Sequence, residues 1–174
     1  MVGPRVPPAS TGGCTSTGGG RAEMADMRLH VKRFDELTVW ELYEILKLRI
    51  DVFVVEQNCP YHEADDLDQA ALHVFLEGED GVQAYLRVMD RGVESEHVSI
   101  GRVIASKRGC GLGGRILQEG IAVAKERFDA RAIYLEAQVY AEGFYETAGF
   151  RRISDSFDID GIPHIKMLRA PDEA

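Results

Sequence analysis

The segment from Ser106 to Arg115 reads SKRGCGLGGR and places four glycines between an apolar run and a pattern typical of a helix. Read literally, Gly109, Gly111 and Gly114 match G-x-G-x-x-G, the spacing that binds the pyrophosphate of a dinucleotide. A shifted frame of the same letters matches R-x-x-G-x-G. In both frames, residues without side chains let backbone N–H groups approach an anion, next to the positive end of the helix that follows.

The sequence around the loop argues against the dinucleotide frame. In that fold the glycines follow the first strand, and repeated strand–helix units continue the chain, whereas here an antiparallel meander precedes the loop. Glu136 lies where a ribose-binding acid belongs, about 20 residues on, but no room remains for a second mononucleotide-binding half. The Walker pattern of a nucleotide-binding loop is not matched either, because no Lys-Ser or Lys-Thr follows the glycines. The frame Arg108-x-x-Gly111-x-Gly113 survives as an anion site, and a tight turn without a ligand stays open beside it.

Composition sets broad limits on the function. The chain has 174 residues, of which 45% are apolar and 28% charged, and a formal net charge of -9. These values predict one globular domain without a general nucleic-acid-binding surface. No apolar run approaches the roughly 20 residues of a membrane helix. The sequence shows neither a disulfide framework nor a metal-ligand pattern at its cysteines, which are Cys14, Cys59 and Cys110. We therefore expect a cytoplasmic protein with no metal site. From the charge and the apolar runs we also expect no nucleic-acid partner and no membrane partner.

The chain divides into one folded unit and two tails. Residues 1–27 are rich in Gly, Pro, Ser and Thr and are predicted to be a disordered tail. Residues 28–170 are predicted to form a single domain, and residues 171–174 a short tail. The expected elements are strands over 29–34, 71–77, 82–90, 97–105, 132–140, 150–161 and 162–168, and helices over 37–57, after the glycine loop, and over 141–149. This order predicts an α/β (α+β) fold with a mixed, mostly antiparallel sheet flanked by helices.

Thr38 is the expected N-cap of the first helix, with Glu41 as its capping-box partner. The apolar face of the helix after the glycine loop is expected to consist of Leu117, Ile121, Ala124 and Phe128.

The strand predicted over 97–105 contains an irregularity in its apolar pattern. Val98 and Ile100 alternate with polar neighbours, but Gly101 and Arg102 disturb the alternation and Val103 resumes it one residue late. An extra residue of this kind indicates a β-bulge, where glycine is common. A bulge splays the strand and frees backbone groups for a ligand.

A second motif downstream decides between the interpretations of the loop. The residues of this motif are Ala141, Tyr145, Gly149 and Phe150. Through this motif and the R-x-x-G-x-G loop together, the chain resembles the GNAT acetyltransferase superfamily, whose second motif has the same spacing. That family carries Asn at the end of the preceding strand, where this chain has Gln138. The stretches LRIDVFVVEQNCPY and DGIPHIKM resemble the ElaA-type branch of the family, and the likeness extends from Leu29 to Arg169.

The resemblance implies a reaction and a set of contacts. It implies direct transfer of an acetyl group from acetyl-CoA to an amine, on a sheet splayed at its bulged central strand. The backbone of Val103, Ile104 and Ala105 would pair with pantetheine, and the amides from Arg108 to Gly113 would hold the pyrophosphate. The residues expected to contact acetyl-CoA are Val103, Ile104, Ala105, Arg108, Gly109, Cys110, Gly111, Leu112, Gly113, Gly114, Gln138 and Tyr145.

Two proton transfers would need catalytic residues. Tyr145 is the family's usual acid for the departing thiolate, with a packing role as the alternative. Glu136 and Glu56 are the candidate bases for the amine, although each is equally compatible with a solvated surface glutamate. Among the histidines, His164 is the most interesting because it lies in the stretch typical of the ElaA branch.

The acceptor and the assembly are not specified by the sequence. We expect an amine on a small molecule or a peptide, and a monomer or homodimer. Two rival interpretations remain. One is a regulatory module of the same fold that binds CoA or a nucleotide without catalysis, and the other is a dinucleotide-dependent oxidoreductase.

Overall fold

The computed structural model describes residues 26–171, so the predicted disordered tail lies outside the described residues except for Asp26 and Met27, as do residues 172–174. Within residues 26–171, eight strands form one sheet in the order β1-β2-β3-β4-β5-β8-β6, with β7 paired to β8. The strands are β1 Arg28–Arg33, β2 Ala71–Gly78, β3 Gly81–Met89, β4 Val98–Ala105, β5 Ile133–Gln138, β6 Phe150–Arg152, β7 Phe157–Ile159 and β8 Ile162–Arg169. Among the strands of the described part of the chain, β4 and β5 are the only pair that runs in parallel, which confirms the predicted mixed, mostly antiparallel sheet.

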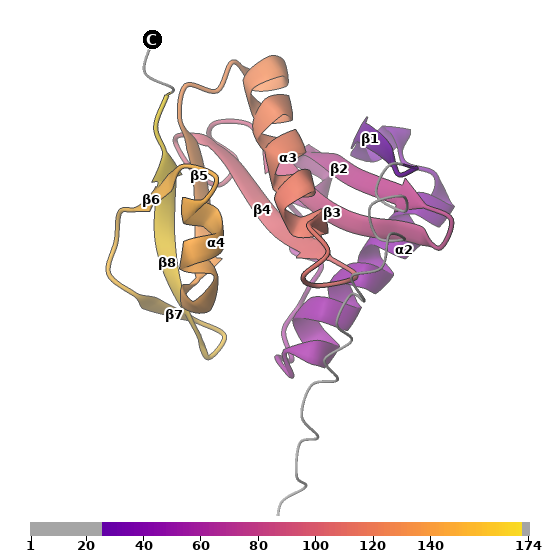
Figure 1. Cartoon of the computed structure of the whole chain (residues 1–174), viewed down its shortest axis with the longest axis horizontal. Coiled ribbons are helices and arrows are strands. Elements are labelled where there is room, and N and C mark those ends of the chain that lie inside the picture. Colours follow the sequence, from indigo (N-terminus) through magenta and orange to yellow (C-terminus); the bar gives the residue numbers. More distant parts are fainter. Residues whose placement is uncertain (1–25, 172–174) are drawn as a thin grey trace, which may run out of the picture.

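Helices cover both faces of the sheet (Figure 1). The α-helices are α2 Val39–Arg49, α3 Leu112–Phe128 and α4 Glu142–Glu146, and a π-helix, η2 Ile50–Glu56, continues α2. Short 3-10 turns form η1 Phe34–Glu36, η3 Asp68–Ala70 and η4 Val139–Ala141. No helix in the described range 26–171 is both long and apolar enough to cross a membrane.

Alternating residues of the strands pack into two separate hydrophobic cores, one on each face of the sheet. Leu86 of β3 belongs to the larger core beneath α3, whereas its neighbour Tyr85 belongs to a smaller core beneath α2. Helix α3 lies very close to the sheet, because a Cβ atom at Gly120 would stand 2.5 Å from Leu86 Cδ2. The predicted face of α3 is confirmed, with Ile121 buried and Phe128 partly buried against the same core.

The helix predicted over 37–57 begins as expected but changes form part-way. The side chain of Thr38 accepts from the Glu41 N–H at 3.2 Å, and the Glu41 carboxylate accepts from the Thr38 N–H at 2.8 Å, so the predicted capping box is confirmed. The α-helical pattern ends at Arg49, and η2 follows as a π-helix. The segment of η2 is rich in β-branched residues, which have a lower helix propensity than the residues of a regular α-helix.

The bulge predicted in β4 is present, and the sheet opens next to it. Tyr85 pairs with Ile104 while Arg87 pairs with Gly101, so two residues of β4 stand opposite the single residue Leu86. Arg102, in the bulge, has a φ of 55°. Strand β4 pairs with β5 only at Val98 and Ser99, and beyond them the two strands diverge (Figure 1). The strand predicted over 150–161 is instead split into β6 and β7, which both pair with β8.

Candidate active site

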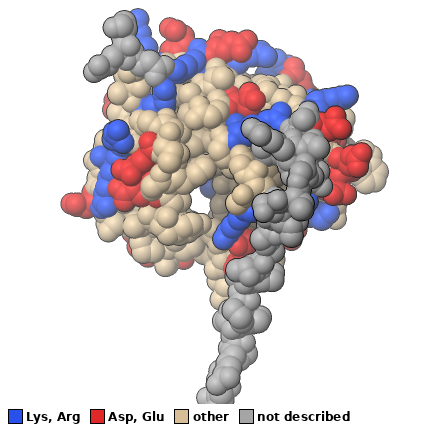
Figure 2. All heavy atoms as spheres, in the orientation of Figure 1, with Lys and Arg blue, Asp and Glu red and all other residues tan. Residues whose placement is uncertain are grey.

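A cavity of about 770 Å³ lies where β4 and β5 diverge. It is lined by residues from η2 and the loop after it, β4, the glycine loop, β5, α4 and the turn between β7 and β8. Figure 2 shows the surface opened between the half of the molecule that holds β5 to β8 and the half that holds β1 to β4. This size lies within the range of small-molecule binding sites, roughly 300–1,000 Å³.

The wall formed by β4 offers backbone groups to a ligand. Val103, Ile104 and Ala105 all line the cavity. Within the described chain, no strand pairs with the β5-facing edge of β4 beyond Ser99. An extended ligand can therefore add to this edge as another strand would, by hydrogen bonding to the main chain.

The glycine loop lies at one end of this wall and leads into α3. Gly109 and Gly111 have φ values of 73° and 79°, a conformation that costs glycine little and other residues more. Gly111 is the N-cap of α3 and supplies no side-chain cap. The first intrahelical bond runs from the Arg115 N–H to the Gly111 carbonyl at 3.0 Å, so the amides of residues 112–114 precede the hydrogen-bonded part of the helix.

Most, but not all, of the loop residues predicted from the sequence line the cavity. Arg108, Gly109, Gly111, Gly113 and Gly114 do so together with Lys107. The side chain of Leu112 is buried in the core under α3, and the Cys110 thiol donates to the Arg108 carbonyl at 3.6 Å. Neither side chain lines the cavity, so these two residues can contribute only backbone groups to ligand binding.

Glu56, a predicted base, lies beside the glycine loop. It is the last residue of η2, and its carboxylate forms an ion pair with the Arg108 guanidinium at 2.6 Å. Both side chains are about half exposed or more, at 47% for Glu56 and 68% for Arg108. The structure therefore brings one candidate base together with the cation predicted to bind phosphate.

Tyr145 reaches the cavity from α4. Its ring packs edge-on against Phe144 and Phe150, with centroid distances of 5.0 and 6.1 Å. Burial raises the pKa of Tyr145 above its usual value of about 10, and nearby Tyr140 raises it further. The hydroxyl group is therefore protonated across the physiological pH range.

Strand β5 carries the other candidate base and the residue at the family's Asn position. Glu136 lines the cavity and accepts a hydrogen bond from the Tyr134 hydroxyl at 2.7 Å. The amides of Gln138 and Gln57 bond to each other in both directions, at 2.9 and 3.3 Å. Gln138 thus ties the end of β5 to the residue that follows η2.

The histidines occupy different environments. His164 stands opposite Gln138 in the pairing of β5 with β8 and lines the cavity. Its Nδ1 lies 2.7 Å from the Ile162 carbonyl oxygen, which fixes that nitrogen as the donor. His73 is fully buried, and burial lowers its pKa. It contacts the Tyr85 hydroxyl and the Asp68 carbonyl, which identifies it as a structural residue.

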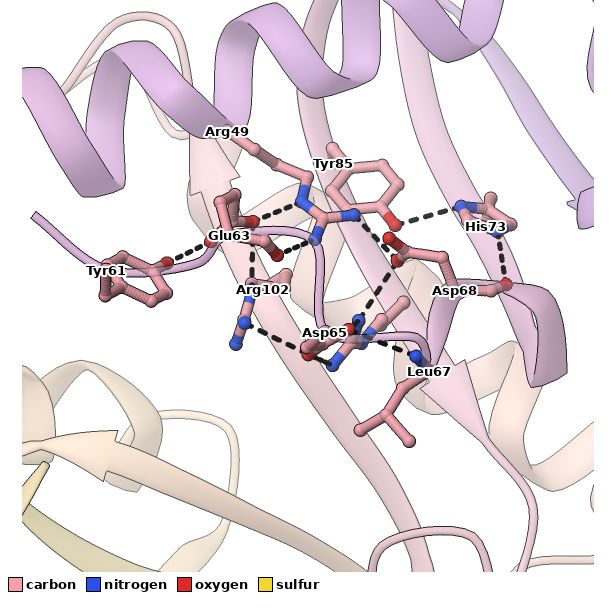
Figure 3. Close-up of polar contacts among 10 residues, drawn as sticks. Arg49, Tyr61, Glu63, Asp65, Leu67, Asp68, His73, Tyr85 and Arg102 are labelled. Atoms are coloured by element: carbon pink, nitrogen blue, oxygen red, sulfur yellow. Dashed lines mark hydrogen bonds and ion pairs between the residues drawn. The ribbon is translucent and has the colours of Figure 1, made fainter.

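A network of charges beside the cavity, four of them buried and two partly exposed, was not predicted from the sequence (Figure 3). It joins three arginines to three carboxylates, and we call it the ion cluster. Its charged members are Arg49, Arg87, Arg102, Glu63, Asp65 and Asp68. The charges balance, as buried ions require.

The cluster fixes the loop between η2 and β2 against the sheet. Arg49 bonds Glu63 and, at 2.7 Å, Asp68, and Arg87 donates two hydrogen bonds to Asp65. Burial alone would raise the pKa of Asp65, but the hydrogen bonds and charge of Arg87 and the charge of Arg102 outweigh it and lower that pKa to about 2. One signal was available in the sequence, because Arg49 falls on the apolar face of its helix and a charge there needs a buried partner.

Comparisons with known proteins agree with this geometry. A family model described as an acetyltransferase (GNAT) domain matches residues 45–170. Protein ElaA of Escherichia coli is 38% identical over 138 residues, which cover 77% of this chain and 90% of ElaA. The crystal structure of E. coli ElaA matches with a TM-score of 0.77 at 35% identity, covering 82% of this chain and 99% of that one. An acyl-CoA N-acyltransferase from Pseudomonas aeruginosa matches with a TM-score of 0.76 at 36% identity, covering 83% and 99%.

Proposed function

The chain belongs to the GNAT acetyltransferase family and resembles its ElaA branch, and from this premise we propose that it is an N-acetyltransferase. Acetyl-CoA would be the acetyl donor, and an amine would attack the thioester directly. The observation that carries the proposal is the divergence of β4 from β5 with a glycine-rich helix start at one end of the opening.

The residues around the opening fit acetyl-CoA. The β5-facing edge of β4 at Val103–Ala105 would pair with the amides of pantetheine, as an added strand does. The first-turn amides of α3, with Lys107 and Arg108 beside them, would hold the pyrophosphate. The cavity is also lined by residues outside these two regions, and an acceptor would bind beside them.

The acceptor must lose a proton before it attacks. A lysine-like amine has a pKa near 10.4, so its neutral form costs about 4–5 kcal/mol at pH 7. A carboxylate that takes the proton, directly or through water, would offset part of this cost. Glu136 lines the cavity, whereas Glu56 is already paired with Arg108, so we assign the base role to Glu136.

The departing thiolate needs a proton or a hydrogen bond. Tyr145 lines the cavity, and its buried hydroxyl stays protonated at neutral pH. We propose that this hydroxyl donates to the sulfur as charge develops there. Proton transfer of this kind contributes about 10²- to 10⁴-fold to the rate.

A turnover screen tests the proposal. Acetyl-CoA is supplied with representatives of four amine classes: small monoamines, polyamines, peptide N-termini and lysine peptides. Acetylated product from at least one class is expected. No product from any class, together with tight CoA binding in a heat-shift titration, would instead support a regulatory module without catalysis. Stabilisation by NAD but not by CoA would support the oxidoreductase alternative.

A further inference from the structure

Arg102 occupies an unusual backbone position in the bulge of β4. Its φ of 55° lies in the left-handed region, which a residue with a long side chain rarely adopts. This conformation persists only where surrounding contacts hold it. The contacts of the Arg102 side chain therefore indicate what the bulge is built to do.

The Arg102 guanidinium contacts two carboxylates of the loop between η2 and β2. Its Nε lies 3.1 Å from Glu63 Oε1, and its Nη2 lies 3.1 Å from Asp65 Oδ2 (Figure 3). The same group lies over two aromatic rings, at 5.8 Å from the centroids of both Phe53 and Tyr61. One side chain thus joins the bulged strand to η2 and to the loop after it.

These partners form one wall of the cavity. Phe53, Tyr61 and Arg102 line the cavity, whereas Arg49 and Arg87 lie deeper in the ion cluster at 0% and 1% exposure. The glycine loop, where the pyrophosphate is proposed to bind, is contributed by other elements. Phe53, Tyr61 and Arg102 do not belong to that loop, so the wall that they form is available to the acceptor.

The charge on Arg102 is already matched. Its two carboxylate partners bind it by hydrogen bonds, and the Tyr61 hydroxyl donates to Glu63. Burial and this bond raise the pKa of Tyr61, so its hydroxyl is committed as a donor within the wall. Neither group is available as an acid or base for the reaction, which leaves them a role in shaping the site.

We propose that Arg102 is a positioning residue for the acceptor: it fixes the loop of residues 57–68 and the rings of Phe53 and Tyr61 against the bulge, and so sets the place of the incoming amine. This inference rests on the proposed acetyltransferase function. Displacement of that wall would remove contacts that hold the amine equally in the bound complex and in the transition state, so the KM for the amine would rise more than kcat would fall.

The test compares Arg102→Met, Arg102→Lys and the control Arg91→Met. The substitution Arg91→Met also removes two hydrogen bonds, which Arg91 donates at 2.7 Å to the Phe128 and Asp129 carbonyls. Arg91 does not line the cavity. With Arg102→Met, the KM for the best amine should rise about tenfold or more, while kcat changes much less and the acetyl-CoA Kd stays within about twofold. Arg102→Lys keeps the charge, so its KM for the amine should lie between the values of the wild type and of Arg102→Met. Arg91→Met should leave all three constants unchanged.

A second measurement does not depend on turnover. Amide hydrogen exchange over residues 57–68 should be faster in Arg102→Met than in the wild type and in Arg91→Met. If the wild type acetylates no amine, the proposed function fails, and the exchange result alone decides whether Arg102 holds the wall. Unchanged exchange overturns the inference, as does an acetyl-CoA Kd that rises as much as the KM of the amine.

Discussion

The carboxylate of Glu56 lies 2.6 Å from the guanidinium of Arg108, so the last residue of η2 already neutralises the first cation of the R-x-x-G-x-G loop. A pyrophosphate bound at this loop would compete with Glu56 for Arg108. The pair is exposed, and such pairs contribute about 0.2–1 kcal/mol. If acetyl-CoA binds there as proposed, Glu56 would lower its affinity.

Replacing Glu56 by Gln should therefore tighten acetyl-CoA binding. We expect the Kd from calorimetric titration to fall by about two- to fivefold at low salt, and by less at high salt, where screening weakens the pair. Glu126→Gln on the exposed side of α3 gives the same change in net charge away from the site. A collapse of kcat in Glu56→Gln would show instead that Glu56 is the base.

Tyr145→Phe removes the proposed acid and keeps the ring. Because Phe144 and Phe150 contact the ring rather than the hydroxyl, folding should be preserved. We expect kcat to fall by about 10²- to 10⁴-fold with a nearly unchanged Kd for acetyl-CoA. Tyr43→Phe, at a side chain exposed on α2, serves as the control. Full activity in Tyr145→Phe would limit Tyr145 to a packing role.

Glu136→Gln tests the assignment of the base. The amide can still accept from Tyr134, whose hydroxyl lies 2.7 Å from Glu136. Turnover should fall by about 10²-fold at pH 7. The difference from the wild type should narrow toward pH 10, where a growing share of the amine is neutral without help. A constant ratio of the two rates across this range would argue against a role in removing the proton.

Because of Asp65, the free energy of unfolding should fall as the pH is lowered below about 4. Its pKa is lowered to about 2 in the folded chain, from about 3.9 in an unfolded one. The stabilisation is therefore present above pH 4 and is lost as the pH falls through the folded value. The expected contribution at pH 7 is about 1–2 kcal/mol. Urea unfolding from pH 6 to pH 2 should show a smaller loss for Asp65→Asn than for the wild type, and parallel curves would refute this account.

Local patterns explain why parts of this structure could be predicted from sequence. The slipped alternation at Gly101 and Arg102 predicted the bulge, and Thr38 with Glu41 predicted the start of α2, because each signal lies within a few residues. Tyr145 was found through a motif of similar length, and the cavity it lines includes most of the predicted loop. Its catalytic role stays a prediction.

Contacts between distant parts of the chain could not be predicted in the same way. The partners in the ion cluster include Arg102 and Glu63, which are 39 residues apart. The carboxylates lie in a loop without periodicity, so nothing in their spacing assigns them to one arginine rather than another. The pairing of Gln57 with Gln138, 81 residues apart, depends on the packing of η2 against the end of β5 and has no local signal either.

The proposed reaction, transfer of an acetyl group from acetyl-CoA to an amine, would take place in the opening between β4 and β5. The most direct measurement follows the CoA thiol and the acetylated amine in the same reaction, with the best amine from the screen. We expect one thiol to be released for each acetylated amine, and both signals to be lost together in Tyr145→Phe. Thiol release without acetylated product, or tight CoA binding with neither signal, would contradict the proposed reaction.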